Sequence, residues 1–311
     1  MNSTAALAIP QTEEQTRIAA ALHAVERAMD TVVNSDVEVL RDASRHILAA
    51  GGKRIRPRLL MLTYLACGGT DVDHAAPAGA AVELMHTASV VHDDINDHGV
   101  LRRGRASVNA VWGRTFALLT GDFLFTAVYS LLAPYSELNV TLAAAARALV
   151  EGETLQASAV KDNNFTRDVY MRIIALKTAA LFQAGGEMGA VLAGASEAQR
   201  VALGQYAFNV GLAFQIVDDV LDIVGDEQKL GKTAGIDVEQ GRGFASIQEG
   251  QAADPMDSIK RKMLQGSYLQ EAQVQAQMLV DTAIQSLNVL PDSVYKQELI
   301  ELAQLTIQRD H

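Results

Sequence analysis

The sequence contains a single cysteine, Cys67, which excludes an intramolecular disulfide. A lone thiol is typical of a reducing compartment, and we expect Cys67 to lie in the core rather than to act in catalysis. Prolines are also few, six in 311 residues, and they are scattered. Because no low-complexity run or Gly/Ser linker divides the chain, we predict one domain over residues 1–311.

Basic residues are too few to balance the acidic ones. The net charge of −11 argues against a nucleic-acid partner, so an anionic ligand would have to be held by a few focused cations or by metal. Residues 1–15 lack the charged start and the apolar stretch of a signal peptide. No uncharged run reaches the roughly 20 apolar residues that span a bilayer. We therefore expect a cytoplasmic protein without a transmembrane segment.

Segments that alternate between apolar and polar residues, as strands do, are nearly absent. Alanine-rich and leucine-rich segments with helical spacing dominate, and 49% hydrophobic residues are enough for a large core. We therefore predict an all-α protein. Residues 1–12 are expected to be disordered, and the glycine-rich residues 225–250 to form a mobile lid loop.

The most informative stretch follows an apolar run, Ala81–Val91, that predicts a buried helix. It carries three acids, Asp93, Asp94 and Asp97, at positions i, i+1 and i+4. On a helix this spacing stacks Asp93 and Asp97 on one face, with Asp94 at the edge of that face. Carboxylates so close repel one another, which indicates a positive partner among them.

The same spacing recurs at Asp218, Asp219 and Asp222, again after an apolar helix, Val210–Val217. A solvated acidic face would explain one such triad. Two triads of identical spacing, each at the polar end of a buried helix, indicate a shared divalent cation. Hard oxygen ligands on few side chains suit Mg²⁺, which keeps several waters and completes its shell with substrate phosphates.

Cations occur at two places where they could hold an anion. Lys53–Arg58 opens a predicted helix, where cations are unfavourable unless they and the helix amides bind an anion together. We select Lys53 and Arg56 from this stretch, for which a solvated basic turn is the alternative. Arg102 and Arg103 follow the first triad, and a guanidinium matches phosphate oxygens through its planar fork. Acids, metal and arginines together predict a polyphosphate clamp.

Polar side chains also interrupt apolar helix surfaces. Lys177, next to Thr178, lies in an apolar segment that we predict as one helix, Tyr170–Ala195. A lysine in such surroundings is costly unless it meets an anion, so we expect it to contact the substrate. His86 precedes the first triad on its helix, where a lone histidine is more often a satisfied core residue. Glu153 we assign to packing.

Together, these motifs resemble those of the trans-isoprenyl (polyprenyl) diphosphate synthases, whose members carry two Asp-Asp-x-x-Asp motifs on facing helices. The resemblance covers about residues 35–245. It implies an all-α, isoprenoid-synthase-type bundle around a central apolar cavity, two or three Mg²⁺ ions per active site and commonly a homodimer. The implied reaction is the 1′-4 trans condensation of isopentenyl diphosphate with an allylic diphosphate, which yields a longer polyprenyl diphosphate.

The resemblance also implies a role for each candidate residue. The diphosphate of isopentenyl diphosphate would be bound by Lys53, Arg56, His86 and Arg103. The magnesium ions on the allylic diphosphate would be coordinated by Asp93, Asp94, Asp97, Asp218, Asp219 and Asp222. The cations around that diphosphate would be Arg102, Lys177, Lys232 and Arg242, where Arg242 replaces a lysine that is usual in the lid. The reacting carbons would be lined by Thr178 and Gln215.

Product length can be predicted from helix geometry. One helical turn rises about 5.4 Å, near the span of one isoprene unit, so the growing tail should run from the first triad back along its helix. Ala88 and Ser89, one turn before Asp93, are small, and Met85 follows a turn further back. An aromatic side chain there would block the tail early. We therefore expect a long-chain product, with a geranylgeranyl diphosphate synthase as the alternative.

Three other functions fit parts of the pattern. A terpene cyclase would use similar acids, and so would a head-to-head synthase of the squalene or phytoene type. Neither needs an isopentenyl diphosphate site at Lys53, Arg56 and His86. A non-catalytic subunit of a heteromeric prenyl synthase would typically lose one triad, whereas both are intact here.

The predicted direction of the tail can be tested at Ala88. Ala88→Phe should shorten the products, because the ring would stand one turn before Asp93, where the tail is expected to pass. Product length would be measured by chromatography after incubation with the two diphosphates. Ser89→Ala, which adds no bulk, should leave the length unchanged. An unchanged distribution in Ala88→Phe would refute this direction of the channel.

Overall fold

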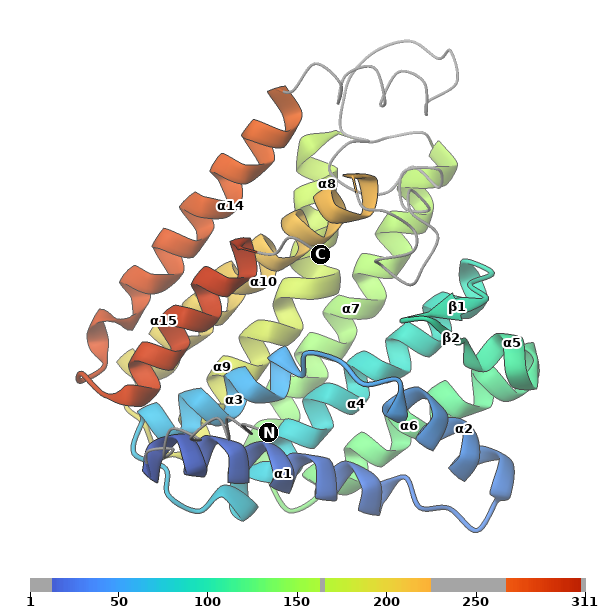
Figure 1. Cartoon of the computed structure of the whole chain (residues 1–311), viewed down its shortest axis with the longest axis horizontal. Helices are drawn as coiled ribbons and strands as arrows, with labels where there is room; N and C mark the ends of the chain where they lie inside the picture. The colour runs from blue at the N-terminus through green and yellow to red at the C-terminus, as the bar shows by residue number, and fades with distance from the viewer. Residues whose placement is uncertain (1–12, 163–165, 225–266, 309–311) are drawn as a thin grey trace, which may run out of the picture.

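The structure, a computed structural model, describes residues 13–162, 166–224 and 267–308. Within these residues it is almost entirely helical, which confirms the all-α prediction (Figure 1). The α-helices are α1 (Glu13–Val32), α2 (Glu38–Ala49), α3 (Ile55–Ala66), α4 (Val72–Asn96), α5 (Val108–Trp112), α6 (Arg114–Leu132), α7 (Ser136–Asp162), α8 (Arg167–Ile174), α9 (Ala180–Leu192), α10 (Glu197–Val224), α14 (Ser267–Ser286) and α15 (Val294–Ile307).

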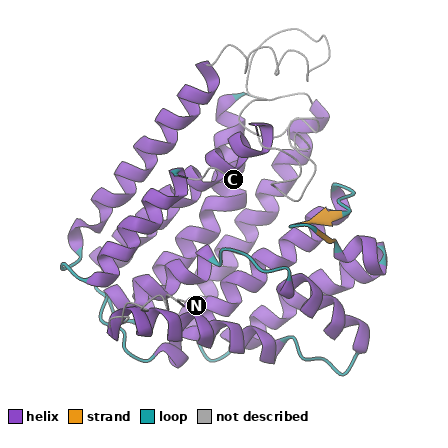
Figure 2. Cartoon of the chain, in the orientation of Figure 1, coloured by secondary structure: helices purple, strands orange, loops and turns teal. Residues whose placement is uncertain are grey.

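The exceptions to α-helix are short. A two-stranded hairpin, β1 (Leu101–Arg102) and β2 (Arg105–Ala106), follows α4 and is the only sheet in the described part of the chain (Figure 2). A single π-helical turn, Ala175–Ala179, separates α8 from α9, so the segment predicted as one continuous helix is interrupted. A 3₁₀ turn, Leu287–Val289, follows α14.

α4 lies inside the bundle, where it packs against α1, α3, α6 and α9 (Figure 1). The sequence explains this position, because apolar residues between Ala75 and Val91 lie on all sides of the helix, with Glu83 and His86 as ionisable exceptions, and a helix that is hydrophobic all round must be buried. Asp71 caps its N-terminus by accepting a hydrogen bond from the backbone N–H of His74. The first acidic triad therefore lies at the C-terminal end of a helix whose preceding turns are buried in the core.

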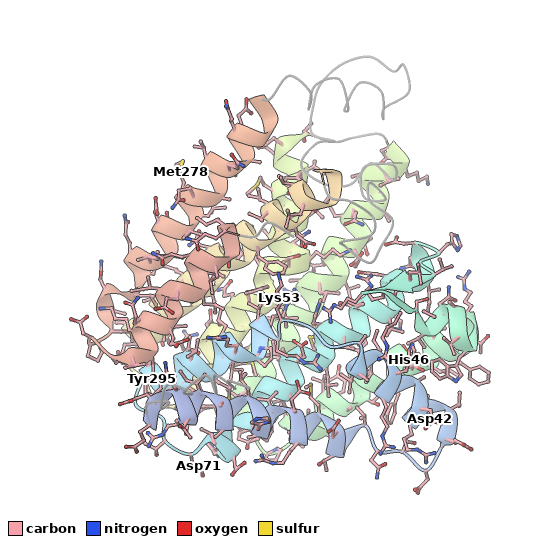
Figure 3. All side chains as sticks on the ribbon, viewed as in Figure 1. Asp42, His46, Lys53, Asp71, Met278 and Tyr295 are labelled. Atoms are coloured by element: carbon pink, nitrogen blue, oxygen red, sulfur yellow. The ribbon has the colours of Figure 1, made fainter. Side chains whose placement is uncertain are left out.

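The C-terminal helices complete the bundle beside α10. α14 packs against α10 and buries Val280 and Ala283, and Leu287 in the following 3₁₀ turn is buried as well. Val274 and Met278 on the same helix are 60% and 64% exposed. Figure 3 shows Met278 on the outer side of α14. The buried face of α14 is therefore limited to the side that packs against α10.

α6 has two apolar faces. One face packs against α4 and is buried through Ala117, Leu124 and Val128. The other leaves Phe116 44% and Tyr129 69% exposed. By length and composition alone, α6 is also the one helix of the described residues that could cross a membrane.

Close helix packing around α9 generates a test of the fold. A Cβ added at Gly189 would lie 2.5 Å from the carbonyl oxygen of Leu60 on α3, whereas one at Gly185 would meet nothing closer than 3.7 Å. Gly189→Ala should therefore destabilise the protein by about 1–3 kcal/mol through overpacking. Gly185→Ala, on the same helix, should be neutral or stabilising because alanine favours helix. Thermal unfolding of both variants measures the difference, and equal melting temperatures would contradict this packing.

Candidate functional site

The first acidic triad lies where α4 ends. Asp97 is the C-cap residue, and its backbone N–H donates to the carbonyl oxygen of Asp93 at 2.8 Å. Asp94 does not stay at the edge of the acidic face as expected, but turns inward and is buried. Its Oδ1 accepts hydrogen bonds from Arg102, from Nη2 at 2.8 Å and from Nε at 3.2 Å. Asp94 and Arg102, expected as ligands of metal and of diphosphate, thus also pair with each other.

Burial changes the chemistry of Asp94. It raises the pKa of this carboxyl, and although Arg102 opposes the change, the neighbouring Asp93 and Asp97 add to it. The second carboxylate oxygen, Oδ2, is buried without a hydrogen-bond partner among the described residues. A buried carboxylate oxygen left in this way is a fitting ligand for a hard cation.

The hairpin after α4 places two arginines beside the triad. Its turn consists of Arg103 and Gly104, both with positive φ (50° and 73°), as a two-residue type I′ turn requires. This turn brings Arg103 against the loop before α3, where a Cβ added at Gly52 would lie 2.5 Å from Arg103 Nη1. Arg102 contacts the first triad, whereas Arg103 lies against Gly52, next to the cationic stretch that begins at Lys53.

The second triad lies near the end of α10. Asp219 is buried, and its Oδ2 accepts from the hydroxyl of Tyr170 on α8 at 2.5 Å. Its Oδ1 accepts from Gln215 Nε2 at 3.0 Å, and Gln215 Oε1 accepts from Thr178 at 2.7 Å. Asp218 is partly exposed, and the side chain of Asp222 lies outside the described residues. Tyr170 was not predicted as a site residue, since a tyrosine in an apolar helix carries no distinctive pattern.

The π-turn brings Lys177 to the first triad. Lys177 Nζ lies 3.4 Å from Asp93 Oδ2 and 2.6 Å from Glu153 Oε1 on α7. π-turns within helices are frequent at functional sites. Glu153 therefore does more than the packing we expected, because it shares Lys177 with Asp93. Burial, together with the charge of Asp93, raises the pKa of Glu153 to about 7.

These contacts form a polar chain between the two triads. Asp93 meets Lys177, the adjacent Thr178 donates to Gln215, and Gln215 donates to Asp219. The helices that carry the triads are thus connected through the π-turn. No group of three or more potential metal-ligand side chains is assembled within the described ranges, where Asp222 is not represented.

The cationic residues of Lys53–Arg58 lie on the loop before α3 and in the first turn of α3. Arg54 forms ion pairs with Glu26 and Glu83, and Arg58 forms one with Glu298 at 2.7 Å. Lys53 and Arg56, the residues selected from the sequence, belong to the same stretch. Lys53 is exposed, and Figure 3 shows it near the centre of the view, where the chain enters α3.

Arg56 and His86 lie in one cationic region. The guanidinium of Arg56 lies over the ring of Phe182, 4.7 Å from its centroid, a cation–π contact. The pKa of His86 is well below its usual value, because the imidazole is removed from water and because Arg56 and Arg103 lie nearby. His86 is therefore neutral near pH 7 and able to donate one hydrogen bond.

The candidate chain-length residues all lie on the buried part of α4. Ala88 is fully buried, Met85 is 4% exposed and Ser89 is 8% exposed. The course of the tail along α4 and the central apolar cavity stay predictions. Lys232, Arg242 and the predicted lid at 225–250 lie outside the described residues, as does the predicted disordered segment 1–12.

Comparisons with known proteins agree with the motifs. The sequence profile of the family described as "Polyprenyl synthetase" matches residues 37–283. The chain is 36% identical over 307 residues to the all-trans-nonaprenyl-diphosphate synthase (geranyl-diphosphate specific) of Rhodobacter capsulatus, covering 91% of this chain and 94% of that protein. It is 39% identical over 248 residues to the short chain isoprenyl diphosphate synthase of Methanocaldococcus jannaschii, covering 78% of this chain and 75% of that protein.

A solved structure is similar over nearly the whole chain. It is the crystal structure of a polyprenyl synthase from Caulobacter crescentus CB15 complexed with calcium and isoprenyl diphosphate. The TM-score is 0.88 at 32% sequence identity, covering 95% of this chain and 98% of that one.

The raised pKa of Glu153 gives a prediction on stability. A carboxyl whose pKa rises from 4.5 to about 7 on folding favours its protonated form in the folded state. Its ionisation therefore costs stability as pH rises through this window. Glu153→Gln, which mimics the protonated form, should gain melting temperature relative to the wild type between pH 5 and pH 8, measured in EDTA.

Glu151 provides the matched control for this experiment. It lies on the same helix, its side chain is 57% exposed, and it pairs with Arg147 instead of the site. Glu151→Gln should show the same pH dependence as the wild type. A constant difference between Glu153→Gln and the wild type at all pH values would contradict the raised pKa.

Proposed function

Because the chain belongs to the polyprenyl synthetase family, we propose that it is a Mg²⁺-dependent trans-prenyltransferase acting as one helical domain. It condenses isopentenyl diphosphate with an allylic diphosphate, 1′-4 and trans, and releases a longer polyprenyl diphosphate. The observation that carries this proposal is the polar chain from Asp93 through Lys177 and Gln215 to Asp219. It links two acidic triads whose like charges repel unless a positive partner lies between them.

The allylic diphosphate would lie between the triads. Magnesium bound there would neutralise the negative charge that develops on the departing diphosphate. Arg102 and Lys177, both held by triad acids, are positioned to contact the same group. We assign Lys232 and Arg242 to the same clamp on the resemblance alone. Cations aimed at the leaving group lower the barrier because they bind the transition state more strongly than the ground state.

The acidic residues fit a hard cation. All six candidates offer carboxylate oxygens, and the buried Oδ2 of Asp94 has no hydrogen-bond partner among the described residues. The similar polyprenyl synthase from Caulobacter crescentus was crystallised with calcium, another oxygen-preferring cation. We propose Mg²⁺, two or three ions per site, held by Asp93, Asp94, Asp97, Asp218, Asp219 and Asp222.

Isopentenyl diphosphate would bind in the cationic region around the start of α3, apart from the two acidic triads. Lys53, Arg56 and Arg103 supply positive charge, and His86, which is neutral, supplies a hydrogen bond without further repulsion. A terpene cyclase or a head-to-head synthase would have no use for this second cationic region. Its presence beside an intact pair of triads favours condensation with isopentenyl diphosphate.

The carbon chemistry would take place beside Thr178 and Gln215. Ionisation leaves an allylic cation that must be kept from water. The buried apolar faces of α4 and α10 would exclude water from the cation. The double bond of isopentenyl diphosphate attacks this cation, and a proton is then lost. We assign the acceptance of that proton to the departing diphosphate, which stays between the triads.

We propose a long-chain product. Ala88 and Ser89 offer no bulk one turn before Asp93, and the relative from Rhodobacter capsulatus, similar over 91% of this chain, makes a nonaprenyl diphosphate by name. A shorter product is the second candidate, because the relative from Methanocaldococcus jannaschii is named a short chain synthase.

We also propose that the enzyme is a cytoplasmic homodimer that uses the exposed face of α6. Phe116, Leu119 and Phe123 recur at helical spacing on that face, and Phe116 and Leu119 are at least 44% exposed. Tyr129, nearer the end of the helix, is 69% exposed. The opposite face already packs against α4. A helix anchored on one side in this way is suited to pair with α6 of a second copy rather than to cross a bilayer.

Turnover with defined substrates tests the proposed function. The purified chain, Mg²⁺, labelled isopentenyl diphosphate and a series of allylic diphosphates should give elongated products, and EDTA should abolish them. Asp93→Asn should reduce the rate by about 10²-fold or more, because it removes charge that binds the metal. Asp281→Asn, on the surface of α14, is the control and should retain full activity.

The outcomes of this experiment separate the rival functions. Conversion of an allylic diphosphate alone to a hydrocarbon would show a terpene cyclase. No elongation with any primer would refute the proposal, whereas the sizes of the products distinguish the long-chain from the short-chain reading.

A further inference from the structure

The region assigned to isopentenyl diphosphate concentrates positive charge before any ligand binds. The cations that act on His86 come from the start of α3 and the residue before it, and from the hairpin: Arg54, Arg56, Arg102 and Arg103. Like charges in a partly buried region repel, and each loses hydration when it is enclosed. Without a bound anion, such a region keeps its structure only if acidic side chains of the protein lie next to the cations.

Glu83 supplies this negative charge. It lies on α4, one turn before His86, and only 5% of its surface is exposed. Its Oε1 lies 2.9 Å from Arg54 Nη1. Its charge also acts on Arg103, where it is the strongest effect opposing the lowering of the pKa by burial. Glu83 is therefore the shared counter-charge of two cations from different segments, one before α3 and one in the hairpin.

Arg54 connects this buried acid to the rest of the fold. Its Nε lies 2.7 Å from Glu26 Oε1 on α1, and its Nη2 donates to the carbonyl oxygen of Leu48 on α2 at 3.1 Å. One guanidinium thus joins α1, α2 and α4 at the start of α3. The planar fork of arginine allows these contacts at the same time, which a lysine could not reproduce in full.

The backbone of Arg54 is also unusual. It has φ 46° and ψ 39°, a left-handed conformation that is uncommon for a residue with a Cβ. Strained residues persist where the surroundings over-determine them, and they cluster at ligand sites. Arg54 stands between Lys53 and Arg56, so its conformation sets how these two cations are placed relative to each other.

We propose that Glu83, Arg54 and Glu26 are positioning residues that pre-assemble the binding region for isopentenyl diphosphate. They hold the left-handed turn between Lys53 and Arg56 and balance the charge of Arg103, without contacting the substrate. The inference rests on the proposed function, since it assigns this region to the non-allylic substrate. It predicts that losing the cluster weakens binding of one substrate and spares the other.

Steady-state kinetics with both substrates test this inference. Glu83→Gln keeps the shape of the side chain and removes its charge, and Arg54→Asn keeps tolerance of the left-handed conformation and removes the ion pairs. Each should raise KM for isopentenyl diphosphate about tenfold or more and change KM for the allylic diphosphate less than about twofold. Arg54→Lys should recover part of the loss.

The control pair lies on the same two helices. Arg27 on α1, next to Glu26, pairs with Asp73 on α4 at 2.8 Å, and both side chains are well exposed. Asp73→Asn removes the charge of an acid on α4 and breaks its ion pair with an arginine, as Glu83→Gln does. Because this pair is exposed, Asp73→Asn should leave both KM values unchanged. The double variant of Arg54→Asn and Glu83→Gln should lose no more than the worse single variant, because both remove one interaction.

A cluster that serves stability alone would give a different result. Folded Glu83→Gln and Arg54→Asn would then show unchanged KM values, or would raise both equally, and either result would overturn the inference. If Glu83→Gln does not fold, Glu26→Gln, at the more exposed end of the cluster, tests the same point.

Binding of isopentenyl diphosphate, measured by calorimetry in EDTA, separates this inference from the proposed function. A wild type that elongates no primer but binds isopentenyl diphosphate more tightly than Glu83→Gln refutes the function and supports the positioning role. Equal binding by both proteins refutes the positioning role, whatever the turnover shows.

Discussion

Charge enclosed among helices must meet opposite charge, and this constraint determines how the site is built. Asp94 is buried against Arg102 and Glu83 is buried against Arg54, and the partly buried Lys177 pairs with Asp93 and Glu153. Removing one partner of such a pair leaves an uncompensated buried charge, which costs far more than the pair contributes. The pairs therefore fix where the hairpin, the start of α3 and the π-turn lie relative to the end of α4.

Small residues make this arrangement possible. Alanine and glycine allow the helices to approach closely, as at Gly152, where an added Cβ would lie 2.8 Å from the backbone nitrogen of Lys177. The approach of α7 to the π-turn lets Glu153 reach the ammonium group. Close helix packing is therefore a condition for the charge pairing, because each ion pair needs a short distance between backbones.

Much of the site could be predicted from the sequence because its residue types are rare in their surroundings. Acids at the ends of apolar helices, and a lysine within one, stand out against the alanine and leucine around them. Tyr170 and Arg54 could not be predicted, since neither a tyrosine in an apolar helix nor one cation among four is distinctive. Glu153 was expected to serve packing alone, and its ion pair with Lys177 could not be predicted because the two residues are distant in sequence.

The sequence by itself determined the all-α class, the two acidic triads and the cations suited to phosphate, because periodicity and residue chemistry are local. Only the tertiary structure decided which of these charges meet. It buried Asp94, interrupted the helix at Lys177 with a π-turn, and paired Arg54 and Arg58 with acids on other helices. These outcomes depend on helices that approach one another from distant parts of the chain, and that approach is set by packing, which no local pattern records.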